Sequence, residues 1–218
     1  MKVICLAGLL VLASFTFAEE ELVPIPLELP KASFQSRLPG RFHRGLEKSR
    51  PSDQPFLVPK NVANVALKKP VTSSDEDPSF GSLALITDGD KDIEKEGHFV
   101  ELGPGTQWIQ IDLQESHELF AVVIWHFFKV DRAYHDVIVQ IADDAIFKAG
   151  ARTVYNNDAD NSSGLGVGTN KEYEDDYMGK LIPVERQKAR YVRCYSRGNN
   201  VNDSNQYIEV EVWGRPAK

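Results

Sequence analysis

Cysteine is scarce in this chain of 218 residues, with only Cys5 and Cys194 present. Cys5 belongs to an N-terminal segment that we expect to be removed, so no intramolecular disulfide can form in the remainder. Disulfide-stabilised scaffolds are therefore excluded. The period of two around Cys194 places this thiol beside Val192 on an apolar face, which predicts a buried cysteine without chemistry.

Long apolar runs are also missing after the N-terminus, where nothing reaches the roughly 18 consecutive apolar residues of a transmembrane helix. Residues 1–18 contain Lys2, an apolar stretch over 3–12 and small or polar residues that end at Ala18. These are the three regions of a secretory signal peptide. We expect cleavage after Ala18 and a soluble, secreted protein that is extracellular or periplasmic.

A basic excess and catalytic motifs are absent too. The formal net charge is −7, with 32 acidic against 25 basic residues, so nucleic acid is not expected as a partner. No serine or cysteine lies in a motif that would activate it as a nucleophile, and no carboxylate pair is placed for glycoside hydrolysis. These absences argue against an enzyme.

Proline, by contrast, is concentrated between Glu19 and Lys60, a segment with seven of the twelve prolines and no sustained period of 2 or 3.6. We expect this segment to be a disordered linker, extended and poorly packed. Six basic residues and a single acidic one, Glu47, lie between Lys31 and Arg50. This stretch fits either an ordinary solvated linker or a contact with an anionic envelope polymer.

Short strands separated by Gly, Asn and Asp clusters fill residues 61–214, enough chain for one domain, and a tail follows at 215–218. Residues 108–113 and 207–213 alternate, which predicts strands with one face in water, and Ile208 and Val210 are expected to point inward together. Residues 119–126 and 137–142 are more apolar throughout, as in central strands, and 180–184 and 190–196 add two more. We predict an all-β sandwich, or jelly roll, of about eight strands.

Five motifs of this region occur in a recognisable order. They are NVALKKPVTSS at 64–74, ITDGD at 86–90, WIQIDL at 108–113, ARYVR at 189–193 and YIEVEVWG at 207–214. The set resembles the discoidin, or coagulation factor type C, domain, which is also described as a galactose-binding-like jelly roll and is similar to family 32 carbohydrate-binding modules. The resemblance spans residues 61–214 and implies the same fold. Domains of this fold bind glycans, phospholipid head groups or proteins, so the resemblance does not define the ligand.

Acidic residues recur around a glycine in the run DGDKDIE at 88–94. Carboxylates at every second position of a turn can converge on Ca²⁺, which accepts about six to eight oxygens. A solvated acidic turn explains the run equally well. Ile93 and Phe99 stand where an EF-hand needs its glycine and its last glutamate, so an EF-hand is excluded.

The resemblance supports a cation in this loop. In such domains a cation is held by backbone carbonyls, by the first aspartate of the loop and by a glutamate of the last strand, which match Asp88 and Glu209. We therefore name Asp88, Asp90 and Glu209 as metal-binding residues and Ca²⁺ as a structural cofactor that would join the two ends of the domain. The alternative for Glu209 is an exposed cross-strand pair with Arg190 or Arg193.

Aromatic, imidazole and guanidinium groups gather in residues 125–136, which join two apolar strands. Sugar recognition combines an aromatic ring against the C–H face of a pyranose with fixed donors and acceptors for its hydroxyls. Family 32 modules hold galactose-type ligands in loops at one end, commonly through His, Arg, Asn and an aromatic ring. The resemblance thus nominates Trp125, His126, Arg132 and Asn205 as ligand-binding residues. Core packing is the alternative for Trp125, and a structural role is the alternative for His126.

Residues 156–168 depart from the family pattern as an insertion rich in oxygen donors and glycine. Asp158, Asp160 and Ser162 alternate, which fits a second cation or a loop that binds hydroxyl groups. A glycine-bent turn held by hydrogen bonds of Asp and Asn side chains explains the composition as well, and we favour it.

Together these features predict a secreted, non-catalytic binding protein. The expected partner is a glycan or cell-envelope polysaccharide, bound by loops at one end of a calcium-stabilised jelly roll. The alternative is an adhesion or assembly protein that uses the same loops to bind a protein partner.

Overall fold

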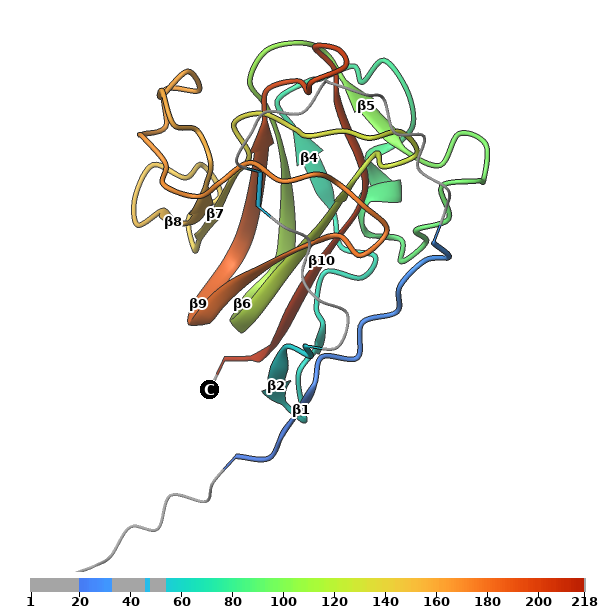
Figure 1. Cartoon of the computed structure of the whole chain (residues 1–218). Coiled ribbons are helices and arrows are strands. Elements are labelled where there is room, and N and C mark those ends of the chain that lie inside the picture. Colours follow the sequence, from blue (N-terminus) through green and yellow to red (C-terminus); the bar gives the residue numbers. More distant parts are fainter. Residues whose placement is uncertain (1–19, 33–45, 48–53, 218) are drawn as a thin grey trace, which may run out of the picture.

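The computed structural model describes residues 20–32, 46–47 and 54–217 (Figure 1). The expected signal peptide and most of the basic stretch between Lys31 and Arg50 lie outside these residues. The described part of the chain contains no helix with the length and hydropathy of a membrane span.

Strands make up nearly all of the regular structure, as the alternating sequence predicts. They are β1 (Leu22–Pro24), β2 (Leu57–Pro59), β3 (Ala63–Asn64), β4 (Val71–Ser73), β5 (Val100–Leu102), β6 (Gln107–His126), β7 (Ile138–Ala142), β8 (Arg152–Asn156), β9 (Lys180–Ser196) and β10 (Asn205–Pro216). A 3-10 helix, η1 (Leu83–Thr87), precedes the acidic run. The main sheet has eight strands in the order β3-β10-β6-β9-β7-β8, with β4 joined to β6 and β5 to β10, which confirms the predicted number.

The long strands β6 and β9 run through both layers of the sandwich that this sheet forms. The first half of β6 pairs with β4, where Val71 lies opposite Ile111, and its second half pairs with β10, where Val122 lies opposite Val212. β9 runs antiparallel to both halves, and an irregularity separates them. Apolar residues of both halves pack in one main core. The sheet therefore curls around a shared interior, and the predicted sandwich is confirmed.

Cys194 lies in this main core. Burial raises the pKa of its thiol to about 12, because the interior disfavours the thiolate. The prediction of a buried, unreactive cysteine is confirmed.

β10 is buried on both faces, which corrects the prediction of one face in water. A β-bulge between Tyr207 and Glu209 shifts the alternation, so Val210 faces the main core whereas Ile208 faces a second apolar cluster. This second cluster also contains Trp125 from β6. The strand runs into the segment expected to be a tail, so the domain extends beyond residue 214.

We define residues 20–32, 46–47 and 54–60 as the N-terminal arm, of which the parts at 20–32 and 54–60 pack on the second cluster and beside β10 (Figure 1). β1 pairs with β2, the N–H of Ile25 donates to the carbonyl of Phe56 over 2.8 Å, and Ile25 and Val58 are buried. Residues that precede proline favour extended backbone, which suits these short strands. The expectation that residues 19–60 are poorly packed is thus corrected for the described part of the arm.

Candidate functional site

The acidic loop after η1 lies against the last strand, as predicted for Asp88 and Glu209. The backbone N–H of Gly89 donates a hydrogen bond to Glu209 Oε2 over 3.2 Å. Asp88 Oδ1 accepts the N–H of Asp90 over 2.8 Å, which closes a tight turn. Gly89 has a φ of 88°, which glycine adopts without the strain of a side chain.

Glu209 is a carboxyl group that forms no ion pair within the described residues. It is fully buried, and its Oε1 atom has no hydrogen-bond partner in the described residues. Burial raises the pKa of Glu209 to about 9. The alternative pairs are excluded, because Arg190 binds Asp112 and Arg193 binds Gln110.

Asp90 points toward basic neighbours instead of toward Glu209. Its Oδ2 lies 2.9 Å from Lys95 Nζ and 3.6 Å from His98 Nε2. Within the described residues, the side-chain oxygens of Asp88, Asp90 and Glu209 do not all come close enough to share one ion. This corrects the predicted ligand set, since Asp90 is paired with Lys95. Asp88 also lies near His98, at 3.7 Å from Nε2, but neither Asp88 nor Glu209 forms an ion pair with a lysine or arginine of the described residues.

Trp125, nominated as a stacking surface for a sugar, is a core residue. Its exposed fraction is 0%, and its Nε1 donates to the carbonyl of Tyr177 over 3.0 Å. Gly179 packs so closely on the indole that a Cβ there would lie 2.5 Å from Cε2. A ring without exposed surface cannot lie against a pyranose, so the nomination is corrected in favour of core packing.

His126 and Arg132 belong to a buried polar network, which corrects their nomination as well. His126 is fully buried, with Nδ1 3.0 Å from Asp175 Oδ1 and its ring stacked on Tyr134 at a centroid distance of 4.3 Å. Arg132 is 8% exposed, and its guanidinium lies 4.9 Å from the ring centre of Phe127. Both side chains have structural contacts in place of a free surface.

Asn205 is also fully buried and ties neighbouring loops together. Its Oδ1 accepts hydrogen bonds from Ser196 Oγ and the N–H of Gly198. Its Nδ2 donates to the carbonyls of Gly103 and Gly105. The amide uses its full hydrogen-bonding capacity inside the protein, so this nomination is corrected too.

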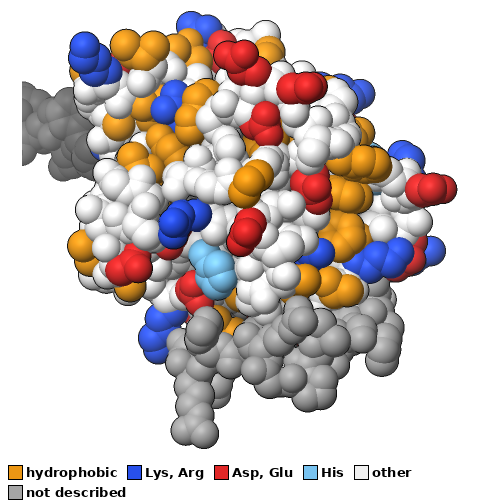
Figure 2. All heavy atoms as spheres, turned by 90° about the horizontal axis from the view of Figure 1, so that it is seen from above, with side chains coloured by type: hydrophobic (Ala, Val, Ile, Leu, Met, Phe, Trp, Pro, Cys, Tyr) orange, Lys and Arg blue, Asp and Glu red, His pale blue; other side chains and the backbone are white. Residues whose placement is uncertain are grey.

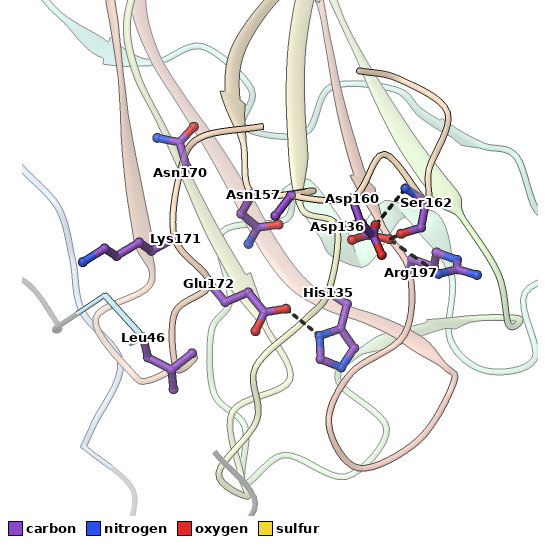
Figure 3. Close-up of a pocket in the computed structure, with 11 residues that line it drawn as sticks. Leu46, His135, Asp136, Asn157, Asp160, Ser162, Asn170, Lys171, Glu172 and Arg197 are labelled. Atoms are coloured by element: carbon purple, nitrogen blue, oxygen red, sulfur yellow. Dashed lines mark hydrogen bonds and ion pairs between the residues drawn. The ribbon is translucent and has the colours of Figure 1, made fainter. Parts of the chain in front are cut away.

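A pocket of about 540 Å³ opens at the edge where three strands end (Figure 3). In the antiparallel register Ile138 lies opposite both Asn156 and Tyr195, which brings the start of β7 and the ends of β8 and β9 together. Side chains from the loops at these three ends, from a segment before β9 and from the arm line the pocket: Leu46, His135, Asp136, Asn157, Ala159, Asp160, Ser162, Asn170, Lys171, Glu172 and Arg197. None of the four nominated ligand-binding residues is among them.

Asp136 belongs to an acidic group on one side of this pocket. Carboxylate oxygens of Asp136, Asp158 and Asp160 lie within 4.8 Å of one another. Asp136 Oδ2 accepts a hydrogen bond from Ser162 Oγ over 2.6 Å and lies 3.8 Å from an Arg197 nitrogen. Burial raises the pKa of Asp136, and the two neighbouring aspartates act in the same direction.

The insertion at 156–168 is held by its own side chains, as the favoured interpretation predicts. Asp158 accepts the N–H groups of Ser162 and Ser163, and Asn161 Oδ1 accepts the N–H of Gly166. Burial would raise the pKa of Asp158, but hydrogen bonds from Ser163 and its neighbours outweigh burial and leave this pKa below its usual value. The loop is therefore a preformed wall of the pocket.

The rest of the pocket supplies donors and a second ion pair. Asn157 is 4% exposed, its Oδ1 accepts the N–H of Val137 over 2.6 Å, and its Nδ2 has no partner in the described residues. His135 Nδ1 lies 2.7 Å from Glu172 Oε1, and this hydrogen bond raises the pKa of His135 (Figure 3). On the face of the molecule seen in Figure 2, acidic and basic side chains and a histidine are likewise interspersed.

The sequence-based nominations did not include Asp136, Asn157 or Arg197. The place of these residues in the sequence was the available signal, because each lies just before or just after a strand. In an antiparallel sheet the start of one strand and the end of its neighbour lie at the same edge. The pairing of β7 with both β8 and β9 decides which ends meet, and no local pattern contains that information.

No protein-family model matches the sequence, and no curated protein sequence matches it. A solved structure of a family 89 glycoside hydrolase from Clostridium perfringens aligns with 70% of this chain at 18% identity, with a TM-score of 0.51. This chain has the galactose-binding-like fold. The aligned region spans only 15% of that hydrolase.

Two smaller solved structures, both binding modules, also match. A fucose-binding module from Streptococcus pneumoniae aligns with 69% of this chain and 96% of its own, at 19% identity and a TM-score of 0.46. A chitosan-binding module from Paenibacillus sp. IK-5 aligns with 70% of this chain and 99% of its own, at 19% identity and a TM-score of 0.45. At these identities the likeness concerns the fold alone.

Proposed function

We propose that the protein binds carbohydrate in the pocket between the ends of β7, β8 and β9. The observation that carries this proposal is Asn157, a residue that lines the pocket and whose buried Nδ2 atom has no hydrogen-bond partner by distance and angle in the described residues. A buried amide donor without a partner is costly, and a ligand oxygen would satisfy it. Carboxylates and cationic groups surround this donor.

The mixture suits a saccharide because each sugar hydroxyl both donates and accepts hydrogen bonds. Asp136 and Glu172 are acceptors, whereas Arg197 and Lys171 are donors, and all four line the pocket. Hydrogen bonds within the insertion fix one wall before a ligand arrives, which reduces the ordering cost of binding. The pocket is therefore built for several directed polar contacts at once.

Asn157→Asp tests this proposal with little change of shape. The retained Oδ1 can still accept the N–H of Val137, while the donor Nδ2 is replaced by an acceptor. We expect affinity for a saccharide to fall roughly tenfold or more, since an oxygen of the ligand would then face an oxygen of the protein. Asn64→Asp is the matched control, because Asn64 lies on β3 outside the pocket.

The assay is calorimetric titration with galactose, fucose and oligosaccharides of N-acetylglucosamine and glucosamine. Binding that Asn157→Asp weakens and Asn64→Asp leaves unchanged supports the proposal. Absence of binding to every saccharide, together with retention of a specific protein partner, would favour the adhesion or assembly alternative. The same samples are assayed for hydrolysis, and we expect no product because the protein is proposed to bind without catalysis.

We also propose that Ca²⁺ binds at the acidic loop through Asp88, Glu209 and backbone carbonyls. The residues fit such an ion, because Glu209 is a buried carboxylate with an unpartnered Oε1 and a raised pKa. A divalent cation would favour the ionised form of this group. Its contribution would be structural, since it would join the loop to the last strand.

Secretion completes the proposal. Its support is the N-terminal pattern of Lys2, an apolar stretch and small residues that end at Ala18. The mass of the exported protein should correspond to a chain that begins at Glu19. A full-length mass, with the protein retained inside the cell, would refute this part.

A further inference from the structure

The N-terminal arm contacts the proposed carbohydrate pocket through two residues, Leu46 and Glu47. The N–H of Glu47 donates to the carbonyl of Glu172 over 2.7 Å, and Glu47 forms a parallel β-bridge with Tyr173. Glu172 is the residue that holds His135. The arm is therefore hydrogen-bonded to the segment that forms one side of the pocket.

The side chain of Glu47 forms an ion pair with Lys180 of β9. Its Oε2 lies 2.6 Å from Lys180 Nζ, and the Lys180 side chain is only 12% exposed. The ammonium group also lies 5.3 Å from the ring centre of Tyr155 and 5.0 Å from that of Tyr173. Two rings fix the lysine side of this ion pair, whereas the Glu47 side chain is 45% exposed.

Leu46 is the largest apolar side chain in the lining of the pocket. Of the residues that line it, only Leu46 and Ala159 are apolar, and none is Phe, Tyr or Trp. A pyranose presents apolar C–H groups as well as hydroxyls, so a binding site needs an apolar surface beside its polar groups. Trp125 cannot provide that surface, because it is buried in the second cluster.

We infer that the arm of this same chain completes the saccharide site, with Leu46 as its main apolar contact and Glu47 as the anchor that holds Leu46 in place. The inference rests on the proposed carbohydrate binding. The contact between a saccharide and Leu46 exists only while the arm is docked. Saccharide binding and arm docking therefore stabilise each other. Saccharide affinity is thus set partly by a segment outside the jelly roll.

Two substitutions with matched controls on the same arm test the inference. Leu46→Ala removes the apolar contact, and Leu57→Ala is its control, since Leu57 is 51% exposed and does not line the pocket. Glu47→Gln weakens the anchor, and Glu21→Gln is its control, since Glu21 forms an exposed pair with Lys60. We expect the first member of each pair to lower saccharide affinity about tenfold, and the controls to leave it unchanged.

Hydrogen exchange at the Glu47 amide reports docking without any saccharide. We expect this amide to be protected in the wild-type protein, less protected in Glu47→Gln, and more protected when the tightest-binding saccharide of the panel is added. An amide that exchanges at the unprotected rate in the wild-type protein would overturn the docking itself.

The outcomes separate the two proposals. A wild-type protein that binds no saccharide refutes carbohydrate binding and, with it, the role of the arm at a saccharide site. A wild-type protein that binds saccharide with the same affinity as Leu46→Ala and Glu47→Gln leaves carbohydrate binding intact and overturns the role of the arm.

Discussion

Trp125→Ala distinguishes a core residue from a ligand-binding residue. The indole is fully buried, donates a hydrogen bond to the carbonyl of Tyr177 and packs directly on Gly179. Truncation of a buried tryptophan costs about 3–5 kcal/mol. The carbonyl left without its donor adds about 1 kcal/mol. Since each kcal/mol shifts the melting temperature of a domain of this size by roughly 2–4 °C, we expect a fall of about 10–20 °C.

Urea unfolding followed by circular dichroism measures this loss, and calorimetry in the absence of urea measures saccharide affinity of the folded protein. Trp108→Ala is the control, because Trp108 is partly exposed and packs on the Arg193 guanidinium at 4.2 Å. We expect a clearly smaller loss there and unchanged saccharide affinity in both variants. A Trp125→Ala protein of wild-type stability that no longer binds saccharide would refute the assignment of this ring to the core.

Three further predictions concern other parts of the molecule. Chelation should lower the melting temperature of the wild-type protein. The free energy of unfolding should fall by up to about 2.7 kcal/mol if Ca²⁺ had been present at a hundredfold excess over its dissociation constant. Glu209→Gln should remove that difference, and a wild-type protein that melts identically with and without chelator would contradict the calcium proposal. The pKa of His135 is raised in the folded protein, so its ion pair with Glu172 stabilises the fold fully below the pKa of the unfolded state. This stabilisation is lost as the pH rises through the pKa of the folded state. His135→Gln should therefore destabilise the protein more at about pH 5.5 than at about pH 8.5. Equal losses of unfolding free energy in urea at both pH values would disprove this. Gly168→Ala should cost about 1–3 kcal/mol, because its Cβ would lie 2.3 Å from a backbone oxygen of β8. Gly103→Ala should cost less, because its Cβ would meet Asp75 Oδ2 at an ordinary 3.5 Å, and thermal unfolding that ranks the two the other way round would contradict the loop packing.

Alternation and apolar runs in the sequence predicted most of β6, β7, β9 and β10, whereas the shorter strands β3, β4, β5 and β8 were not predicted. Ile109, Ile111 and Leu113 point into the core as predicted, because a period of two leaves one face apolar. The acidic loop was also correctly expected to lie beside Glu209, since the family resemblance related these distant segments. Neither inference required knowledge of side-chain packing.

The ligand-binding residues were harder to predict, because exposure depends on what covers a strand. Trp125 lies on the outer face of its sheet, where a solvent-facing role was reasonable until the arm and the segment around Tyr177 covered it. The bulge in β10 likewise moved Ile208 to that face. Prolines in the arm suggested a loose linker, yet isolated residues such as Ile25 are enough to dock it.

Backbone amide shifts during saccharide titration test the central claim most directly. We predict that the tightest-binding saccharide of the panel shifts the amide signals of Asp136, Asn157 and Arg197, at the joined ends of three strands, and leaves Gly89 in the acidic loop unchanged. Shifts confined to the acidic loop, or a spectrum that no saccharide changes, would contradict a carbohydrate site in this pocket.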